Sequence, residues 1–187
     1  MCEYCGCQAL PQIAELTREH DLVVNLIGDV RTAHRDADVP RMAWIARRVS
    51  AVLVPHTAVE EQGLFPPLAA EFPDGMAALR AEHRLVEAVL DEAAAGVPAD
   101  PVWPRRLLDA LDLLRDHILK EQDGVFPAAL AGLSTEDWEA MDAVRSRVGT
   151  MSTGFATTGF ATEAGVDIDQ HSGSQQDGPL TPGKAAS

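Results

Sequence analysis

Histidine and glutamate recur in this sequence at spacings that suit metal binding. Residues 56–66 read HTAVEEQGLFP and residues 117–127 read HILKEQDGVFP, so the pattern His-x3-Glu occurs twice, followed each time by Gly, Phe and Pro. His20 and His83 also occupy matching positions upstream, 63 residues apart. The chain therefore contains two copies of one unit. Each copy is expected to be a helical hairpin with one histidine on its first helix and His-x3-Glu on its second.

These polar residues continue the apolar stripes of the predicted helices and therefore point toward the interior. Side chains four positions apart share one face of a helix, so each His-x3-Glu pair points in one direction. The interior-facing candidates are His20, His56, Glu60, His83, Glu87, His117 and Glu121. Burying carboxylates without compensation costs several kcal/mol, so this set requires a cation inside the bundle. Two octahedral ions share such ligands more easily than one, and imidazole with carboxylate suits iron, manganese or zinc.

A structural reading of the same histidines is the alternative. A lone histidine on an apolar face is more often a hydrogen-bonded core residue than a metal ligand. Four such histidines, one on each predicted helix and accompanied by glutamates at matching offsets, favour the metal site. Glu19 and Glu61 point off the apolar stripe, so we expect them to be solvated or to hydrogen-bond the ligands from outside.

Four stretches with an apolar period near 3.6 residues must position these side chains. They run from Ile13 to Val30, from Met42 to Leu64, from Met76 to Leu90 and from Trp103 to Val125. Breaks rich in proline, glycine and aspartate separate them, and Ser134 is expected to cap a short fifth helix. The predicted fold is all-α: residues 11–148 form an antiparallel four-helix bundle of two duplicated helical hairpins, with the short extra helix.

The composition excludes several classes of partner. The 187 residues include 29 acidic and 15 basic side chains, a net charge of −14. This charge repels phosphate backbones and anionic membrane surfaces, so neither nucleic acid nor a membrane is expected as a partner. No apolar run is long enough to span a bilayer and no signal peptide is visible, so a cytoplasmic location is expected. Residues 149–187, which hold seven of the 14 glycines, are expected to form a disordered Gly/Ser/Thr-rich tail.

Residues 1–10 form a separate N-terminal segment that contains all three cysteines: Cys2, Cys5 and Cys7. Three thiols within seven residues cannot build a disulfide framework. Their close spacing suggests a redox pair or an accessory metal site. A tetrahedral zinc site needs a fourth ligand, which is not obvious in the sequence, so a reduced and unliganded terminus is the alternative.

At these residues the sequence resembles the hemerythrin-like family of non-haem di-iron bundle proteins, with its pattern H…HxxxE…H…HxxxE. The resemblance covers about residues 15–130. Ferritin-like bundles are the rival, but their motif is Glu-x-x-His with more carboxylate ligands. The resemblance implies two iron ions joined by an oxo or hydroxo bridge and by the carboxylates of Glu60 and Glu121. The iron ligands that it implies are His20 with His56 for one ion and His83 with His117 for the other.

The resemblance also bears on function. Oxygen-carrying members have a further histidine where this chain has Glu87, and an aspartate as the last ligand where it has Glu121. A carboxylate at the first of these positions makes the site harder and more anionic, which stabilises ferric iron and disfavours reversible oxygen carriage. Val24 is the equivalent of Glu87 in the first unit, so the two irons are expected to be unequal.

The expected function is the binding or processing of O2, peroxide or nitric oxide, in the response to oxidative or nitrosative stress. If the chain is catalytic, it is a peroxide- or NO-processing di-iron oxidoreductase. The alternative is a non-catalytic redox or oxygen sensor, or an iron-handling module, that signals through the N-terminal cysteines or the tail. Turnover of peroxide by the iron-loaded protein distinguishes the two.

Overall fold

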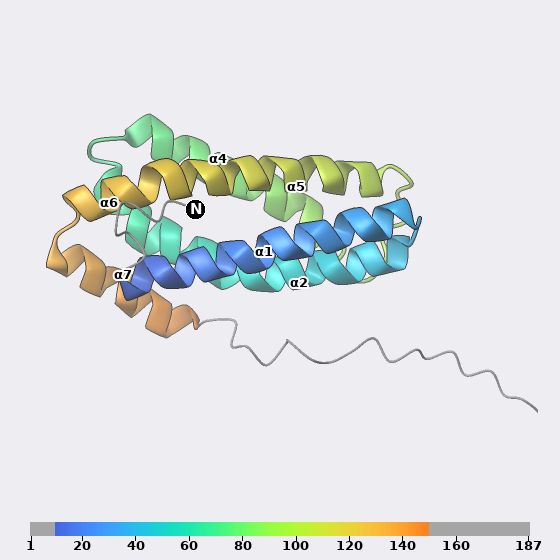
Figure 1. The fold of residues 1–187 in the computed structure, drawn as a ribbon, viewed down its shortest axis with the longest axis horizontal. Coiled ribbons are helices and arrows are strands. Elements are labelled where there is room, and N and C mark those ends of the chain that lie inside the picture. Colours follow the sequence, from blue (N-terminus) through green and yellow to red (C-terminus); the bar gives the residue numbers. More distant parts are fainter. Residues whose placement is uncertain (1–9, 150–187) are drawn as a thin grey trace, which may run out of the picture. The chain divides into compact units, whose positions relative to one another are not determined.

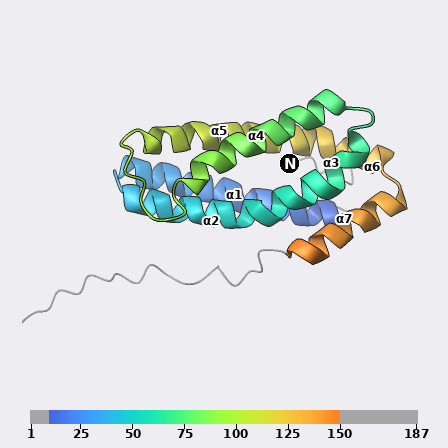
Figure 2. The same ribbon diagram turned by 180° about the vertical axis from the view of Figure 1, so that it is seen from behind.

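The computed structural model describes residues 10–149. Its four long helices are α1 (Pro11–Arg35), α2 (Val39–Val59), α4 (Pro73–Asp91) and α5 (Trp103–Lys120). Helix α1 pairs with α2 and α4 pairs with α5, so both predicted hairpins form, and the helices run antiparallel (Figure 1, Figure 2). The prediction of an all-α helical bundle is confirmed.

Proline and aspartate set where the long helices begin. Each of the four has a proline in its first turn, where the missing N–H would have had no partner in the helix. Asp38 caps α2 by accepting a hydrogen bond from the backbone N–H of Arg41 at 2.9 Å. Because only residues 36–38 separate α1 from α2, the two helices lie side by side.

A wider helical turn follows both α2 and α5. The π-helical turns η2 (Glu60–Leu64) and η3 (Glu121–Val125) lead into the short helices α3 (Phe65–Leu68) and α6 (Phe126–Gly132). The two turns occupy equivalent places in the duplicated units, and each begins at the glutamate of a His-x3-Glu motif. Such single π turns inside helices frequently occur at functional sites.

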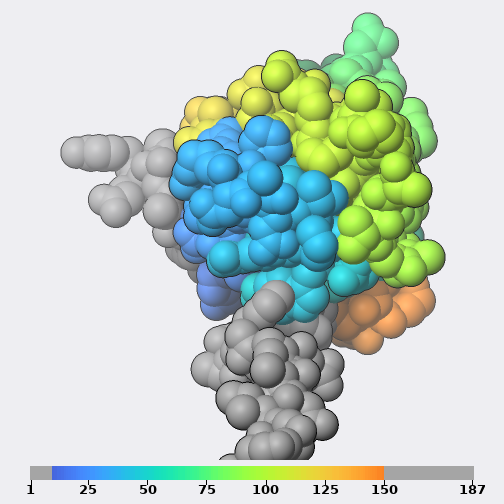
Figure 3. Space-filling view, turned by 90° about the vertical axis from the view of Figure 1, so that its right-hand side faces the viewer, coloured from blue at the N-terminus to red at the C-terminus, as the bar shows by residue number. Residues whose placement is uncertain are grey.

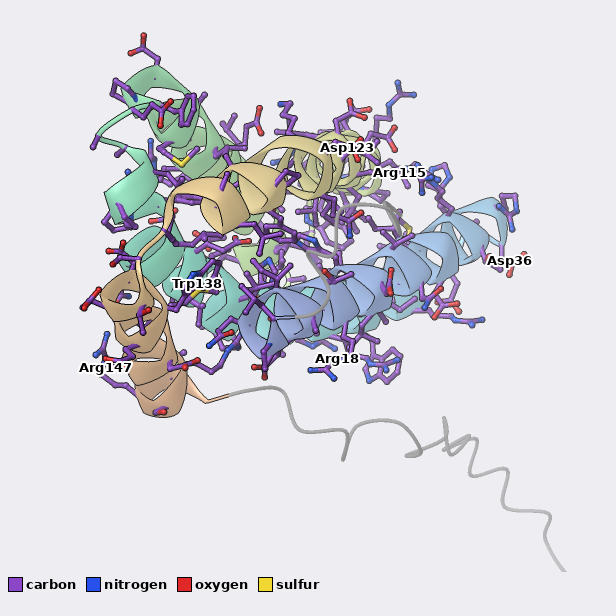
Figure 4. The ribbon with its side chains drawn as sticks, turned by 60° about the vertical axis from the view of Figure 1, so that its left-hand side comes forward. Arg18, Asp36, Arg115, Asp123, Trp138 and Arg147 are labelled. Atoms are coloured by element: carbon purple, nitrogen blue, oxygen red, sulfur yellow. The ribbon has the colours of Figure 1, made fainter. Side chains whose placement is uncertain are left out.

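A further helix, α7 (Thr135–Val148), packs against η2 and α2 and beside the start of α1 (Figure 4, where Trp138 and Arg147 are labelled on α7). Ser134 and Asp137 form a reciprocal capping box at its start. The prediction of a fifth helix capped by Ser134 is therefore confirmed.

Glycine permits the close approach of α7 to the first π turn. A Cβ atom on Gly63 would lie 3.0 Å from the Cα atom of Met141. A Cβ atom on Gly124, the equivalent residue of the second unit, would meet no atom within 4 Å. The duplicated units therefore differ in what covers their π turns.

The core of the bundle consists of two apolar clusters with a polar layer between them. The first cluster includes Trp103 and Leu111, and the second includes Phe65 and Phe126. Figure 3 looks onto the end where the α1–α2 turn, in blue, lies beside the α4–α5 connection, in yellow-green. Along α1, α2 and α4, the change from one cluster to the other falls at a histidine, and in α5 His117 lies one position before the last residue of the first cluster, Ile118. These four histidines are at most 4% exposed.

The predicted N-terminal cysteine segment and the predicted tail lie outside the described residues, apart from residues 10 and 149 at their edges. None of the helices within residues 10–149 combines the length and the apolar character that crossing a bilayer requires.

Candidate metal centre

Six of the seven predicted interior ligands meet in the polar layer. Each long helix contributes its histidine, and each π turn contributes its first residue, a glutamate. The side chains form two overlapping groups, and within each group the candidate ligand atoms all lie within 4.8 Å of one another. The groups are His20, His56, Glu60 and Glu121, and Glu60, His83, His117 and Glu121.

Both glutamates belong to both groups, and each presents one carboxylate oxygen to each group. The distances to the histidine Nε2 atoms are 3.2 Å (His56) and 3.5 Å (His83) for Glu60, and 3.0 Å (His117) and 3.3 Å (His20) for Glu121. Two adjacent ligands of an octahedral ion with bonds near 2.1 Å lie about 3.0 Å apart. The separations therefore suit two cations that share both carboxylates.

The hydrogen bonding of these side chains points to the same conclusion. Glu60 and Glu121 are 0% exposed, and none of their four carboxylate oxygens has a hydrogen-bond partner among residues 10–149. The Nε2 atoms of His83 and His117 are only 2.9 Å apart, so a proton or a metal ion must lie between them. Buried carboxylates that accept no hydrogen bond are costly, and a donor set of imidazole nitrogens and carboxylate oxygens suits iron, manganese or zinc. The residues present therefore fit a metal pair.

Three of the four imidazoles are held from outside by a carboxylate. The Nδ1 atom of each donates a hydrogen bond, which fixes the ring and leaves Nε2 for a metal. The pairs are His56 with Glu19 at 2.8 Å, His83 with Glu61 at 2.9 Å and His117 with Glu82 at 2.9 Å. Glu19 and Glu61 were expected to be solvated or to hydrogen-bond the candidate ligands from outside, and the structure shows the second alternative. Sequence reasoning missed Glu82, although its alignment with Glu19 in the duplicated units was a usable signal.

His20 is held differently from the other three. Neither of its ring nitrogens has a hydrogen-bond partner among the described side chains and backbone. Its ring stacks on Phe126, with centroids 5.6 Å apart, and His83 stacks in the same way on Phe65 at 5.9 Å. Each phenylalanine of the duplicated motif therefore packs on the first-helix histidine of the other unit. The residue equivalent to Glu61 in the second unit is Gln122, which explains why His20 lacks a carboxylate partner.

Protons on two histidines balance the buried carboxylates in the metal-free chain. Burial opposes charge on His56, but the carboxylates of Glu60 and Glu19 outweigh it and raise the pKa to about 10. Burial is likewise outweighed at His117, where Glu121 and other carboxylates raise the pKa to about 9. Charged imidazoles thus occupy the centre when no metal does.

The carboxylates respond in the opposite direction. Burial favours the neutral acid, yet neighbouring imidazoles hold the pKa of Glu121 well below its usual range. His56 and Arg145 lower the pKa of Glu19 against the same effect of burial. These carboxylates therefore stay ionised at neutral pH and can serve as metal ligands or as acceptors for imidazole N–H groups.

Glu87 is the predicted ligand that the structure does not bring into either group. Its carboxylate accepts a hydrogen bond from the hydroxyl of Thr57 at 3.2 Å. The side chain is half-buried beside a cavity of about 180 Å³ between α2 and α4. Its role as a metal ligand stays a prediction, and so does the predicted role of the three cysteines, which lie outside the described residues.

Comparison with known proteins agrees with this geometry. The family model described as hemerythrin HHE cation binding domain matches residues 12–129, which include both hairpins, both π turns and all six converging side chains. Neither the comparison with curated proteins nor that with solved structures finds a match. Because the family model covers more than half of the chain, the protein belongs to the hemerythrin HHE cation-binding family.

Proposed function

We propose that this chain holds two iron ions and uses them to bind or process a dioxygen species (O2 or peroxide) or nitric oxide. The observation that carries the proposal is the double sharing of Glu60 and Glu121, each with one oxygen directed to each histidine pair. Bound iron would supply electron transfer to and from a small ligand at an open coordination position. The proposal includes a cytoplasmic location and a role in the response to oxidative or nitrosative stress.

The protein would contribute ligands, orientation and a dry environment. His20 and His56 would hold one ion, and His83 and His117 the other. Glu19, Glu61 and Glu82 keep three of the imidazole rings oriented through their Nδ1 atoms. Apolar side chains next to the ligands, such as Leu16 and Val23, are fully buried and exclude water. Such surroundings favour a ligand that is small and weakly polar.

Metal analysis of the purified protein tests the proposal directly. We expect two iron ions per chain and an absorption spectrum typical of an oxo- or hydroxo-bridged pair. The double variant His56→Ala/His117→Ala should lose most of its metal and unfold more readily, because Glu60 and Glu121 would stay buried without the metal and without their nearest imidazoles. His34→Ala is the matched control, since His34 is exposed on α1. Unchanged iron content in the double variant contradicts the ligand assignment.

A non-catalytic sensor or iron-handling module is the second candidate. It is favoured by the contact between the metal centre and α7, which lies beyond the segment matched by the family model. Single-turnover experiments with peroxide and binding experiments with nitric oxide separate the two candidates. Rapid consumption of peroxide supports an oxidoreductase, whereas reversible binding without turnover supports a sensor.

A further inference from the structure

Helix α7 reaches the candidate metal centre through one largely buried arginine, Arg145. The guanidinium of Arg145 donates two hydrogen bonds to the carboxylate of Glu19: Nη1 to Oε1 at 3.0 Å and Nη2 to Oε2 at 2.9 Å. The same Oε2 atom accepts the hydrogen bond from His56 Nδ1 at 2.8 Å. The Arg145 and Glu19 side chains are only 12% and 10% exposed. A two-pronged contact of this kind fixes the carboxylate plane as well as its charge.

In the second unit, the cation that contacts the equivalent carboxylate comes from the unit itself. Glu82, the equivalent of Glu19, accepts a hydrogen bond from Lys120 of α5 while it holds His117. Alignment of the two motifs places Val59 opposite Lys120, and Val59 is 1% exposed within the second apolar cluster. The first unit therefore has no internal cation at that position.

Other contacts hold α7 in the register that this interaction needs. Arg147 donates a hydrogen bond to the side chain of Gln62 in η2 at 2.8 Å, and Gln12 donates one to Asp142 at 2.9 Å. Gly63 allows the two backbones to approach. Helix α7 is thus seated on the same π turn that begins with the shared carboxylate Glu60.

From these contacts we infer that Arg145 is a positioning residue for the metal ion at the His20/His56 position, acting through Glu19 on His56. The inference rests on the proposed function, because it assumes that His56 binds a metal. Coupling of this kind is reciprocal: if docking of α7 tightens metal binding at this position, then metal binding must tighten the docking of α7.

Stepwise titration of the metal-free full chain with Co²⁺, followed by optical absorption, tests the inference. Removing a partner that holds a ligand from outside commonly costs a factor of about 10–100 in metal affinity. Arg145 lies one contact further out than Glu19, so Arg145→Gln should weaken one of the two binding steps about tenfold, the lower end of this range, and leave the other unchanged. Arg145→Lys, which keeps the charge without the two-pronged contact, should restore part of the loss. Lys120→Gln is the matched control, and it should affect the other step.

A structural role alone would give a different result. If Arg145→Gln lowers the melting temperature of the metal-free protein but leaves both Co²⁺ affinities unchanged, the inference is overturned. Binding of fewer than two Co²⁺ ions by the unaltered chain contradicts the dinuclear proposal instead. If the unaltered chain binds only one Co²⁺ ion, the inference is still tested by the affinity for that ion. An affinity that is the same in Arg145→Gln overturns it.

Amide hydrogen exchange on the unaltered chain provides a test that needs no variant. Loading with Zn²⁺ should slow exchange in α7 (Thr135–Val148) beyond the change seen at the α1–α2 turn, because metal and α7 stabilise each other through Glu19. The His56 Nδ1 proton should also exchange more slowly with water in the loaded protein. Exchange in α7 that does not respond to Zn²⁺ contradicts the coupling.

Discussion

Metal binding at this centre should release protons, and the number released depends on the protonation of His56 and His117. Carboxylate neighbours raise the pKa of His56 to about 10 and that of His117 to about 9, in each case against the effect of burial. Both imidazoles are therefore doubly protonated at pH 7. Their Nδ1 protons are held by Glu19 and Glu82, so the proton that a metal must displace is the one on Nε2.

We therefore expect about two protons to be released when the metal-free chain binds two Zn²⁺ ions at pH 7. The product of the two binding constants should then rise about 100-fold per pH unit between pH 6.5 and 8.5, or about 2.7 kcal/mol per unit. Calorimetric titrations in two buffers with different enthalpies of ionisation count the protons directly. Release of fewer than one proton, or an affinity that does not depend on pH, would refute the reasoning.

The metal-free protein offers an independent check of the same pKa values. A histidine whose pKa is raised on folding stabilises the native state fully below its unfolded pKa, near 6.5. That contribution is lost as pH rises through the folded value, which is about 10 for His56. The free energy of unfolding of the metal-free chain should therefore fall between pH 7 and 10. Urea denaturation at several pH values measures this change, and a constant free energy over that range would contradict the assignment.

Two further predictions concern the differences between the duplicated units. Gly63→Ala should destabilise the protein, because the added Cβ atom would lie 3.0 Å from the Cα atom of Met141. Gly124→Ala should be neutral or stabilise the protein by up to about 1 kcal/mol, because its Cβ atom would meet nothing within 4 Å. Thermal denaturation compares the two variants, and equal effects would contradict the close packing of α7. Gln122→Glu should give His20 Nδ1 the carboxylate acceptor that it lacks and tighten Co²⁺ binding at one position about tenfold; an unchanged titration would show that the carboxylate does not reach the ring.

Local sequence signals were sufficient for the helices and for most of the side chains that converge in the polar layer. The apolar spacing in α1 and α5 continues through His20 and His117, so the inward direction of these histidines follows from the helix period alone. Ser134 with Asp137 predicts the start of α7 because a capping box depends only on residues three apart. The duplication added the expectation that equivalent ligands face each other, and the geometry of the two glutamates agrees with it.

Other features depend on contacts between distant segments and have no local signature. π-helical turns begin at Glu60 and Glu121. The spacing of apolar residues over a few positions does not distinguish a π-helical turn from an α-helical one, so the sequence did not predict them. Arg145 and Glu19 are 126 residues apart, so their pairing depends on where α7 docks. For Glu87, a local signal was present but did not predict its contacts. Its spacing from His83 places both residues on one helix face, yet its carboxylate accepts a hydrogen bond from Thr57 of the neighbouring helix.

The duplication explains both the symmetry of the centre and its departures from symmetry. Each unit supplies two histidines and one shared carboxylate, so the converging side chains at the two positions are chemically the same. The aligned sites that differ around the two positions include two that bear on the outer contacts, where the second unit has Lys120 for Val59 and Gln122 for Glu61. The second histidine pair is consequently held by two carboxylates from outside, and the first pair by one, with an arginine from α7 behind it. Since a carboxylate behind an imidazole increases its strength as a ligand, ions at the two positions should differ in affinity even with identical inner ligands.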